Sequence, residues 1–234
     1  MAIAYVQHVN AGTGSTSVSS LTTANFGSSV GSGSLITVVI RAANAATVSS
    51  VTDTLGTTYG ADVTDNDQDP AMFIWSGITS SGGTNAVTVT FGASGNFRWC
   101  DAIEVTGIAT TTPLETTEFK NGTGVTDLVL DAITTTQADQ FIVAGFGQNA
   151  FADYTVGADF TLIDGTIPDS EAPGAQFGGT QYRITVSALS SYVTHMTSTS
   201  SGNYTGVLAT YKGAAAGGTA VKDMIGTGFI PFAR

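Results

Sequence analysis

Short segments in which apolar and polar residues alternate recur along the whole chain, and polar turn residues separate them. A period of two is the pattern of a β-strand that buries one face. No capped amphipathic segment with apolar residues three and four positions apart runs longer than about ten residues, so helices are limited to single turns. The sequence therefore predicts an all-β fold, a jelly-roll-like antiparallel sandwich. The predicted strands lie at 35–40, 87–91, 103–105, 128–130, 141–143, 182–186 and 207–211.

The two halves of the chain contain similar runs. Ser-Gly-Asn-Phe at 94–97 is followed by a strand that ends in Gly, and so is Ser-Gly-Asn-Tyr at 201–204. We infer two related halves, about 1–107 and 108–213, which together form the sandwich at 1–213. One sandwich with pseudo-twofold symmetry and two stacked sandwiches both satisfy this pattern, and we favour one composite sandwich.

Charged residues are scarce, at 11% of the chain against 42% hydrophobic residues. Thr and Ser keep the solvent face of a sheet hydrated while their small or β-branched side chains fit the pleat. The formal net charge of −11 repels phosphate backbones, which argues against nucleic acid as a partner. The single cysteine, Cys100, has no intrachain disulfide partner, and we expect a buried, inert thiol.

The sequence shows no secretion signal and no membrane anchor. Its first residues lack a basic segment followed by a long apolar run, and no apolar stretch reaches the roughly 18 residues that span a bilayer. A surface-protein composition without a signal is natural for a phage component, which assembles in the cytoplasm and is released by lysis. We therefore expect a location in the virion, with the cell surface or the extracellular space as alternatives.

The last part of the chain, 214–234, differs in composition from the rest. Small residues at 213–218 suggest a hinge, and large apolar residues follow it. Each would cost about 1.5–3 kcal/mol if left exposed. We expect this tail to dock either on its own sandwich or on a neighbouring subunit. The predicted interface residues are Met224, Ile225, Phe229, Ile230 and Phe232.

Five motifs follow one another in the first half: a strand at 35–40, a Val-Thr-Asp turn in Val48–Asp53, an aromatic strand at 73–75, a Val-Thr-Val-Thr strand at 87–90, and a Glu-containing strand ending in Gly at 103–107. The second half continues the series at 133–136, 141–144 and 156–161. In these motifs the chain resembles a family of bacterial and phage surface β-sandwich proteins that includes virion-associated structural proteins. The resemblance covers most of 30–213 and implies the fold more firmly than a function.

A loop rich in acidic residues suggests a metal site. Carboxylate oxygens close together are the ligands that calcium prefers, although their spacing here differs from that of an EF-hand loop. The alternative is a solvated loop in which Asp and Asn side chains cap their own turns. The candidate calcium ligands are Asp62, Asp65, Asp67 and Asp69.

No motif in the sequence predicts an enzyme. Acidic pairs can be drawn from Asp101, Glu104, Glu115 and Glu118, but no spacing singles out a pair, and Glu104 is expected on a wet strand face. The chain lacks the Gly-x-Ser-x-Gly nucleophile pattern. Neither histidine, His8 or His195, has another ligand at a metal-site spacing.

We therefore predict a non-catalytic virion structural protein, namely a capsid decoration or cement protein with homo-oligomeric or other virion partners. A tail, spike or filament subunit is a related alternative. The alternative of another class is a carbohydrate-binding or receptor-binding module that binds a glycan on exposed aromatic rings. The aromatic residues considered for such a platform are Trp75, Phe151, Tyr154, Tyr192 and Tyr204.

Overall fold

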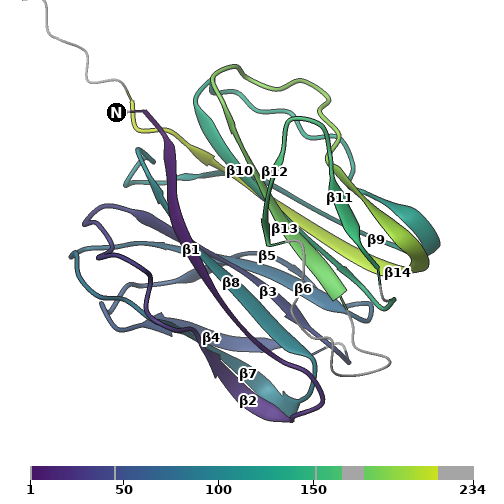
Figure 1. Ribbon diagram of the computed structural model, residues 1–234. Helices are drawn as coiled ribbons and strands as arrows, with labels where there is room; N and C mark the ends of the chain where they lie inside the picture. The colour runs from purple at the N-terminus through teal and green to yellow at the C-terminus, as the bar shows by residue number, and fades with distance from the viewer. Residues whose placement is uncertain (1, 45, 151, 165–176, 216–234) are drawn as a thin grey trace, which may run out of the picture.

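The computed structural model describes residues 2–44, 46–150, 152–164 and 177–215, and within them the chain is all-β and antiparallel (Figure 1). The predicted all-β antiparallel sandwich is confirmed, whereas the jelly-roll connection stays a prediction. The strands are β1 (Ala4–Thr13), β2 (Val18–Thr22), β3 (Leu35–Ala42), β4 (Val48–Asp53), β5 (Gly60–Asp65), β6 (Ala71–Ile78), β7 (Val87–Gly95), β8 (Arg98–Thr106), β9 (Leu114–Val129), β10 (Gln140–Gln148), β11 (Tyr154–Val156), β12 (Thr161–Asp164), β13 (Phe177–Thr185) and β14 (His195–Lys212).

The strands form three sheets that segregate by position in the chain. Strands of the first half form a five-stranded sheet in the order β1-β8-β3-β6-β5 and a three-stranded sheet in the order β2-β7-β4. Strands of the second half form one sheet in the order β11-β14-β10-β13-β12, with β9 also paired to β14. Figure 1 shows the five-stranded sheet lying between the three-stranded sheet and the second-half sheet.

The two halves repeat one strand order. β9-β14-β10-β13-β12 follows the same sequence of neighbours as β1-β8-β3-β6-β5. The register also agrees: Leu35 lies opposite Val105 and Phe141 lies opposite Tyr211, a shift of 106 positions in both strands (35 to 141, 105 to 211). The smaller sheet is repeated as well. In the first half β7 pairs with β2 on one side and with β4 on the other. In the second half the start of β14 pairs in the same way with the end of β9 and with β11.

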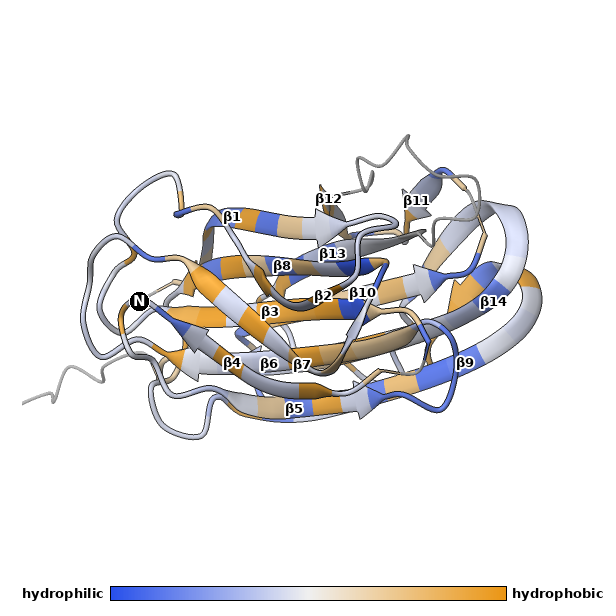
Figure 2. Ribbon diagram, turned by 90° about the horizontal axis from the view of Figure 1, so that it is seen from below, coloured by the Kyte–Doolittle hydropathy of each residue, from blue (hydrophilic) through white to orange (hydrophobic). Residues whose placement is uncertain are grey.

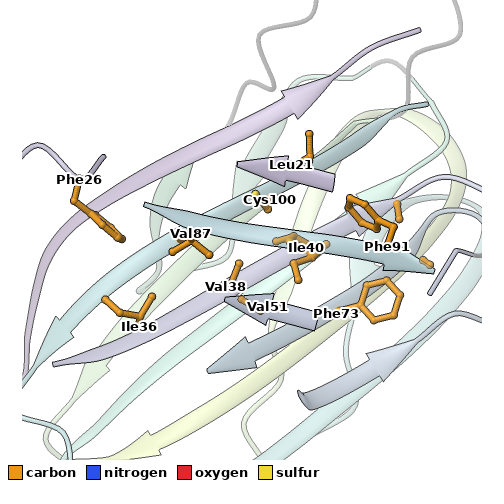
Figure 3. Close-up of a cluster of buried hydrophobic side chains, with 14 of the residues drawn as sticks. Leu21, Phe26, Ile36, Val38, Ile40, Val51, Phe73, Val87, Phe91 and Cys100 are labelled. Carbon is orange, nitrogen blue, oxygen red and sulfur yellow. The ribbon is translucent and has the colours of Figure 1, made fainter. Parts of the chain in front are cut away.

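Three apolar cores separate the layers. The first lies between the three-stranded and five-stranded sheets and contains Phe73, Val89 and Phe91 (Figure 3). The second joins the two halves and contains Ile103 from β8 and Phe141 from β10. The third lies inside the second half. This packing corresponds to two stacked sandwiches rather than to the single composite sandwich that we favoured.

The strands between the cores have no solvent face. All residues of β3 and of β10 are buried, as are nearly all of β8. Figure 2 shows the apolar character that runs along β3. The expectation of one buried face is therefore wrong for these strands, because a sheet placed between two others must be apolar on both sides.

Candidate functional site

The four predicted calcium ligands are not brought together. Asp62 accepts a hydrogen bond from Tyr211 Oη at 2.6 Å, and Asp65 accepts one from the Asn121 amide at 3.2 Å. Asp69 accepts the backbone N–H of Asn44 at 2.9 Å. Among the described residues, no group of three or more His, Cys, Asp or Glu side chains is arranged to hold a metal ion. Calcium at Asp62, Asp65, Asp67 and Asp69 therefore stays a prediction.

Asp62 instead ties the two halves together. It lies on β5 of the first half, and its partner Tyr211 lies on β14 of the second half and is fully buried. Thr37 Oγ1 is 3.2 Å from the same Tyr211 hydroxyl. Burial raises the pKa of Asp62, and burial together with the Asp62 carboxylate raises the pKa of Tyr211. This polar contact therefore joins β5 and β3 of the first half to β14 of the second half at the second core.

Asp53, in the Val-Thr-Asp turn, holds the segment after β4 in place by hydrogen bonds. Its carboxylate accepts the backbone N–H of Leu55 at 3.1 Å and of Thr57 at 2.9 Å, the Tyr59 hydroxyl at 3.0 Å and the Asn85 amide at 3.0 Å. Burial alone would raise the pKa of Asp53, but the hydrogen bonds outweigh it and the pKa is lowered.

Asp53→Asn is expected to lower the free energy of unfolding by about 1 kcal/mol at pH 7, because charge-assisted hydrogen bonds become neutral ones. The lowered pKa means that the wild-type stability from Asp53 is present above the unfolded value of about 3.9 and is lost as the pH falls through the folded pKa. Urea unfolding at pH 7 and below pH 4 measures the free energy of unfolding of both proteins. The difference between the wild type and Asp53→Asn should be smaller in acid. An equal advantage at both pH values would contradict this account, and the exposed Asp153→Asn is the control.

Glu104 does not face solvent, which corrects the expectation from strand alternation. It is only 1% exposed, and its carboxylate accepts the Gly31 backbone N–H at 2.8 Å, the Ser34 hydroxyl at 2.8 Å and the Gln7 amide at 2.7 Å. Gln7 in turn holds the backbone of Ser28. The carboxylate therefore joins β8 to β1 and to the loop before β3, and all these contacts are structural.

Two of the other acidic candidates lie on strands of different halves. Asp101 is buried on β8, and Glu115 lies on β9, where it accepts hydrogen bonds from Thr136. Cys100 is fully buried, and burial raises the pKa of its thiol to about 12, which confirms the predicted buried thiol.

One of the predicted aromatic residues lines a surface pocket. Trp75 packs against the first core, Tyr154 and Tyr204 are buried, and Phe151 lies outside the described residues. Tyr192 remains at the surface, where it lines a cavity of about 160 Å³. We call this cavity the Tyr192 pocket; its walls are Gly157, Ala158, Asp159, Phe160, Tyr192, Val193 and His195.

The Tyr192 pocket combines aromatic and charged groups. The Arg183 guanidinium lies 4.7 Å from the centre of the Tyr192 ring, and Phe160 stacks against that ring with centroids 6.3 Å apart. Asp159 pairs with Arg183 at 3.5 Å, and His195 Nδ1 is 3.3 Å from Asp127 Oδ1. Sequence reasoning missed Phe160 and Arg183. The fold brings both residues beside Tyr192, and no spacing in the sequence connects the three positions.

A second and larger hollow lies just beyond the end of β14, at Ala214. It has a volume of about 260 Å³, and its wall includes two exposed apolar side chains, Val186 at 78% and Ile184 at 38% exposure. Figure 1 shows the N-terminus beside the end of β14 at this place. We call it the root groove; it is lined by Ala2, Ile3, Asp139, Ile184, Thr185, Val186 and Ala214.

Hydrogen bonds fix the chain at the point where it enters the root groove. The Gly213 N–H donates to Asp139 O at 2.8 Å, and the Ala214 N–H donates to Gly107 O at 2.7 Å. The backbone of Gly213 and Ala214 is therefore held by the first half and by the residue before β10. The predicted interface residues Met224, Ile225, Phe229, Ile230 and Phe232 themselves lie outside the described residues.

Comparison of the chain with protein-family models, with curated proteins and with solved structures finds no match in any of the three. The resemblance to bacterial and phage surface sandwiches therefore stays a prediction. In the part of the chain that the structure describes, no helix has the length and apolar character needed to cross a bilayer.

Proposed function

We propose that this chain is a non-catalytic structural subunit of a virion, a capsid decoration or cement protein that contacts its neighbours through the C-terminal tail 214–234. The observation that carries the proposal is the root groove: the exposed apolar side chains of Ile184 and Val186 lie in the same hollow as Ala214, and the apolar C-terminal segment follows Ala214 in the sequence. Apolar surface at such a place is typical of a site of protein association.

The use of the acidic side chains supports the same proposal. Asp53, Asp62 and Glu104 direct their oxygens at backbone and side-chain donors of the sandwich itself. The chain has few charged residues, but most of them are acidic, and it is rich in Thr and Ser. Such a composition suits a protein that must stay soluble at high local concentration. A tail, spike or filament subunit would use the same surfaces. The position of the chain within the particle distinguishes these alternatives.

Mass spectrometry of particles purified on a density gradient from the phage that encodes the chain tests the proposal. The expected result is that the chain co-purifies with the particles in many copies and is reduced to background in particles from a gene deletion. Its absence from the particles, with the chain present in the soluble lysate, would contradict a virion role.

A glycan-binding module is the second candidate function, and the Tyr192 pocket favours it. The pocket is about the size of one pyranose ring, and aromatic rings beside Asp159 and His195 match the apolar and hydroxyl faces of a sugar. This function requires neither the root groove nor the segment after it.

Tyr192→Ala is expected to reduce binding to any glycan that the full chain captures on an array by about five- to tenfold, since removal of a stacking ring costs about 1–1.4 kcal/mol. The exposed Phe119→Ala on β9 is the matched control, with binding unchanged. Glycan binding that survives Tyr192→Ala would show that the pocket is not the sugar site.

A further inference from the structure

We infer that the outer edge of β9 is a self-association surface, through which two copies of this chain pair edge to edge about a twofold axis at Phe119. The surface is separate from the C-terminal tail, and the inference does not depend on a virion role. It assigns one partner to the edge, a second copy of the same chain, whose Phe119 lies opposite the first.

β9 is an edge strand. Of the strands that the structure describes, only β14 pairs with it, and Figures 1 and 2 show β9 beside β14 at one side of the molecule. The pairing with β14 runs from Thr116 to Asn121 without a register shift, and this segment contains no proline. A regular edge of this kind is a template for another strand.

The backbone of this segment is oriented to pair with a further strand. The Thr116 N–H donates to Thr210 Oγ1 on β14 at 3.2 Å. Because the backbone groups of successive residues point to opposite sides of a strand, those of Thr117, Phe119 and Asn121 point away from β14. In an antiparallel pair centred on Phe119, the Phe119 groups of the two copies bond to each other, and Thr117 bonds to Asn121 of the other copy.

The side chain at the axis is apolar and exposed. Phe119 is 51% exposed, and it is the one aromatic residue among the large hydrophobic side chains that the described part of the chain leaves at the surface. Pairing about Phe119 places the two rings opposite each other, and aromatic pairs across neighbouring strands stabilise a sheet. Self-association therefore covers a ring that the single molecule leaves in water.

The charges beside Phe119 are self-complementary. Glu118 and Lys120 lie on the face of β9 opposite to that of Phe119, since successive side chains alternate. With the axis at Phe119, each Glu118 lies opposite Lys120 of the other copy, so one contact is made twice, as a twofold interface requires. An axis at Glu118 or at Lys120 would instead place like charges opposite each other, which is unfavourable.

Lys120 remains available for this contact. Within one molecule it pairs with Asp131, but both side chains are largely exposed, at 40% and 66%, and such surface pairs contribute little. A lysine alone on an edge strand deters pairing with another strand. Glu118, two positions away on the same face, gives the lysine of a second copy an acidic partner and removes that deterrent.

The dimer is expected to be weak, because pairing along one short strand buries less than the roughly 1,200 Å² of a stable specific interface. It therefore forms at high protein concentration, as in an assembly of many neighbouring copies. In dilute solution the chain is monomeric, and unfolding of β9 variants there measures the stability of the monomer.

Sedimentation velocity of the full-length chain, over a concentration series up to about 1 mM, tests the surface. The wild type is expected to shift from monomer to dimer. Glu118→Lys and Lys120→Glu each create two like-charge contacts and should weaken self-association about tenfold. The double variant E118K/K120E restores opposite charges and should return to within about twofold of the wild type. Asp153→Lys, which changes the net charge as Glu118→Lys does at an exposed position outside β9, is the control and should associate as the wild type does.

A wild type that stays monomeric at every concentration would overturn the inference. So would single variants that associate as the wild type does, a result that assigns self-association to another surface such as the C-terminal tail. A double variant as weak as the single variants would overturn the pairing of Glu118 with Lys120.

A disulfide provides an independent measurement. Directly opposite residues of a hydrogen-bonded antiparallel pair have Cα atoms about 5.5 Å apart, within the range that a disulfide bridges. Oxidised Phe119→Cys is therefore expected to form a covalent dimer, and the native thiol, Cys100, is fully buried. The control is Val193→Cys, at a position 47% exposed, and equal cross-linking of the two variants would contradict an axis at Phe119. None of these results changes whether the chain is found in particles, so the proposed function is tested separately.

Discussion

Phe141→Ala is expected to lower the free energy of unfolding by about 3–5 kcal/mol, the range for removing a fully buried Phe. Phe141 is 0% exposed in the second core, with ring centroids 5.8 Å from Tyr182 and 6.4 Å from Tyr211. Both halves contribute side chains to this core. For a chain of this size the melting temperature should fall by on the order of 10 °C.

Phe119→Ala is the matched control for this prediction. Phe119 lies on β9 at 51% exposure, and its truncation should change stability by less than about 1 kcal/mol. Urea unfolding of both variants measures the difference. Equal, small losses for the two variants would show that the halves do not share a tightly packed core.

Glu104→Ala is expected to cost about 3 kcal/mol, because three donors lose their acceptor in a buried site. Glu104→Gln keeps one acceptor oxygen and should lose about half as much. Hydrogen exchange should locate the damage in β1 and in the loop before β3, which the carboxylate joins. The control is Glu118→Ala on the edge strand β9, where a loss below about 0.5 kcal/mol is expected. A similar cost at both positions would contradict the structural role of Glu104.

The sequence predicts the strands well because their period and turn residues are local signals. Its error over Glu104 has one cause: alternation places the side chain on the face opposite Ile103, and that face is also buried. The signal for this was present in Leu35–Ala42, which is almost continuously apolar rather than alternating, as expected of a strand covered on both sides. The stacked arrangement could have been predicted from that run.

The surfaces were less predictable than the strands. The root groove gathers residues from four separate segments, around Ile3, Asp139, Val186 and Ala214, and no spacing in the sequence connects them. Tyr192 was considered with four other aromatic residues. Burial separates it from Tyr154 and Tyr204, and contact with the first core separates it from Trp75. The hydrogen bond from the Leu55 N–H to Asp53 could have been predicted, since Asp side chains commonly bind the backbone N–H two residues later.

The binding of the purified chain to particles assembled without it tests the central claim most directly. Full-length chain and a chain ending at Ala215 are mixed with particles from the gene deletion, and the bound fraction is measured by co-sedimentation. We predict saturable binding of the full-length chain and at least a tenfold loss for the shorter chain, with the melting temperatures of the two chains within a few degrees. Equal binding of the two chains would contradict assembly through the C-terminal segment.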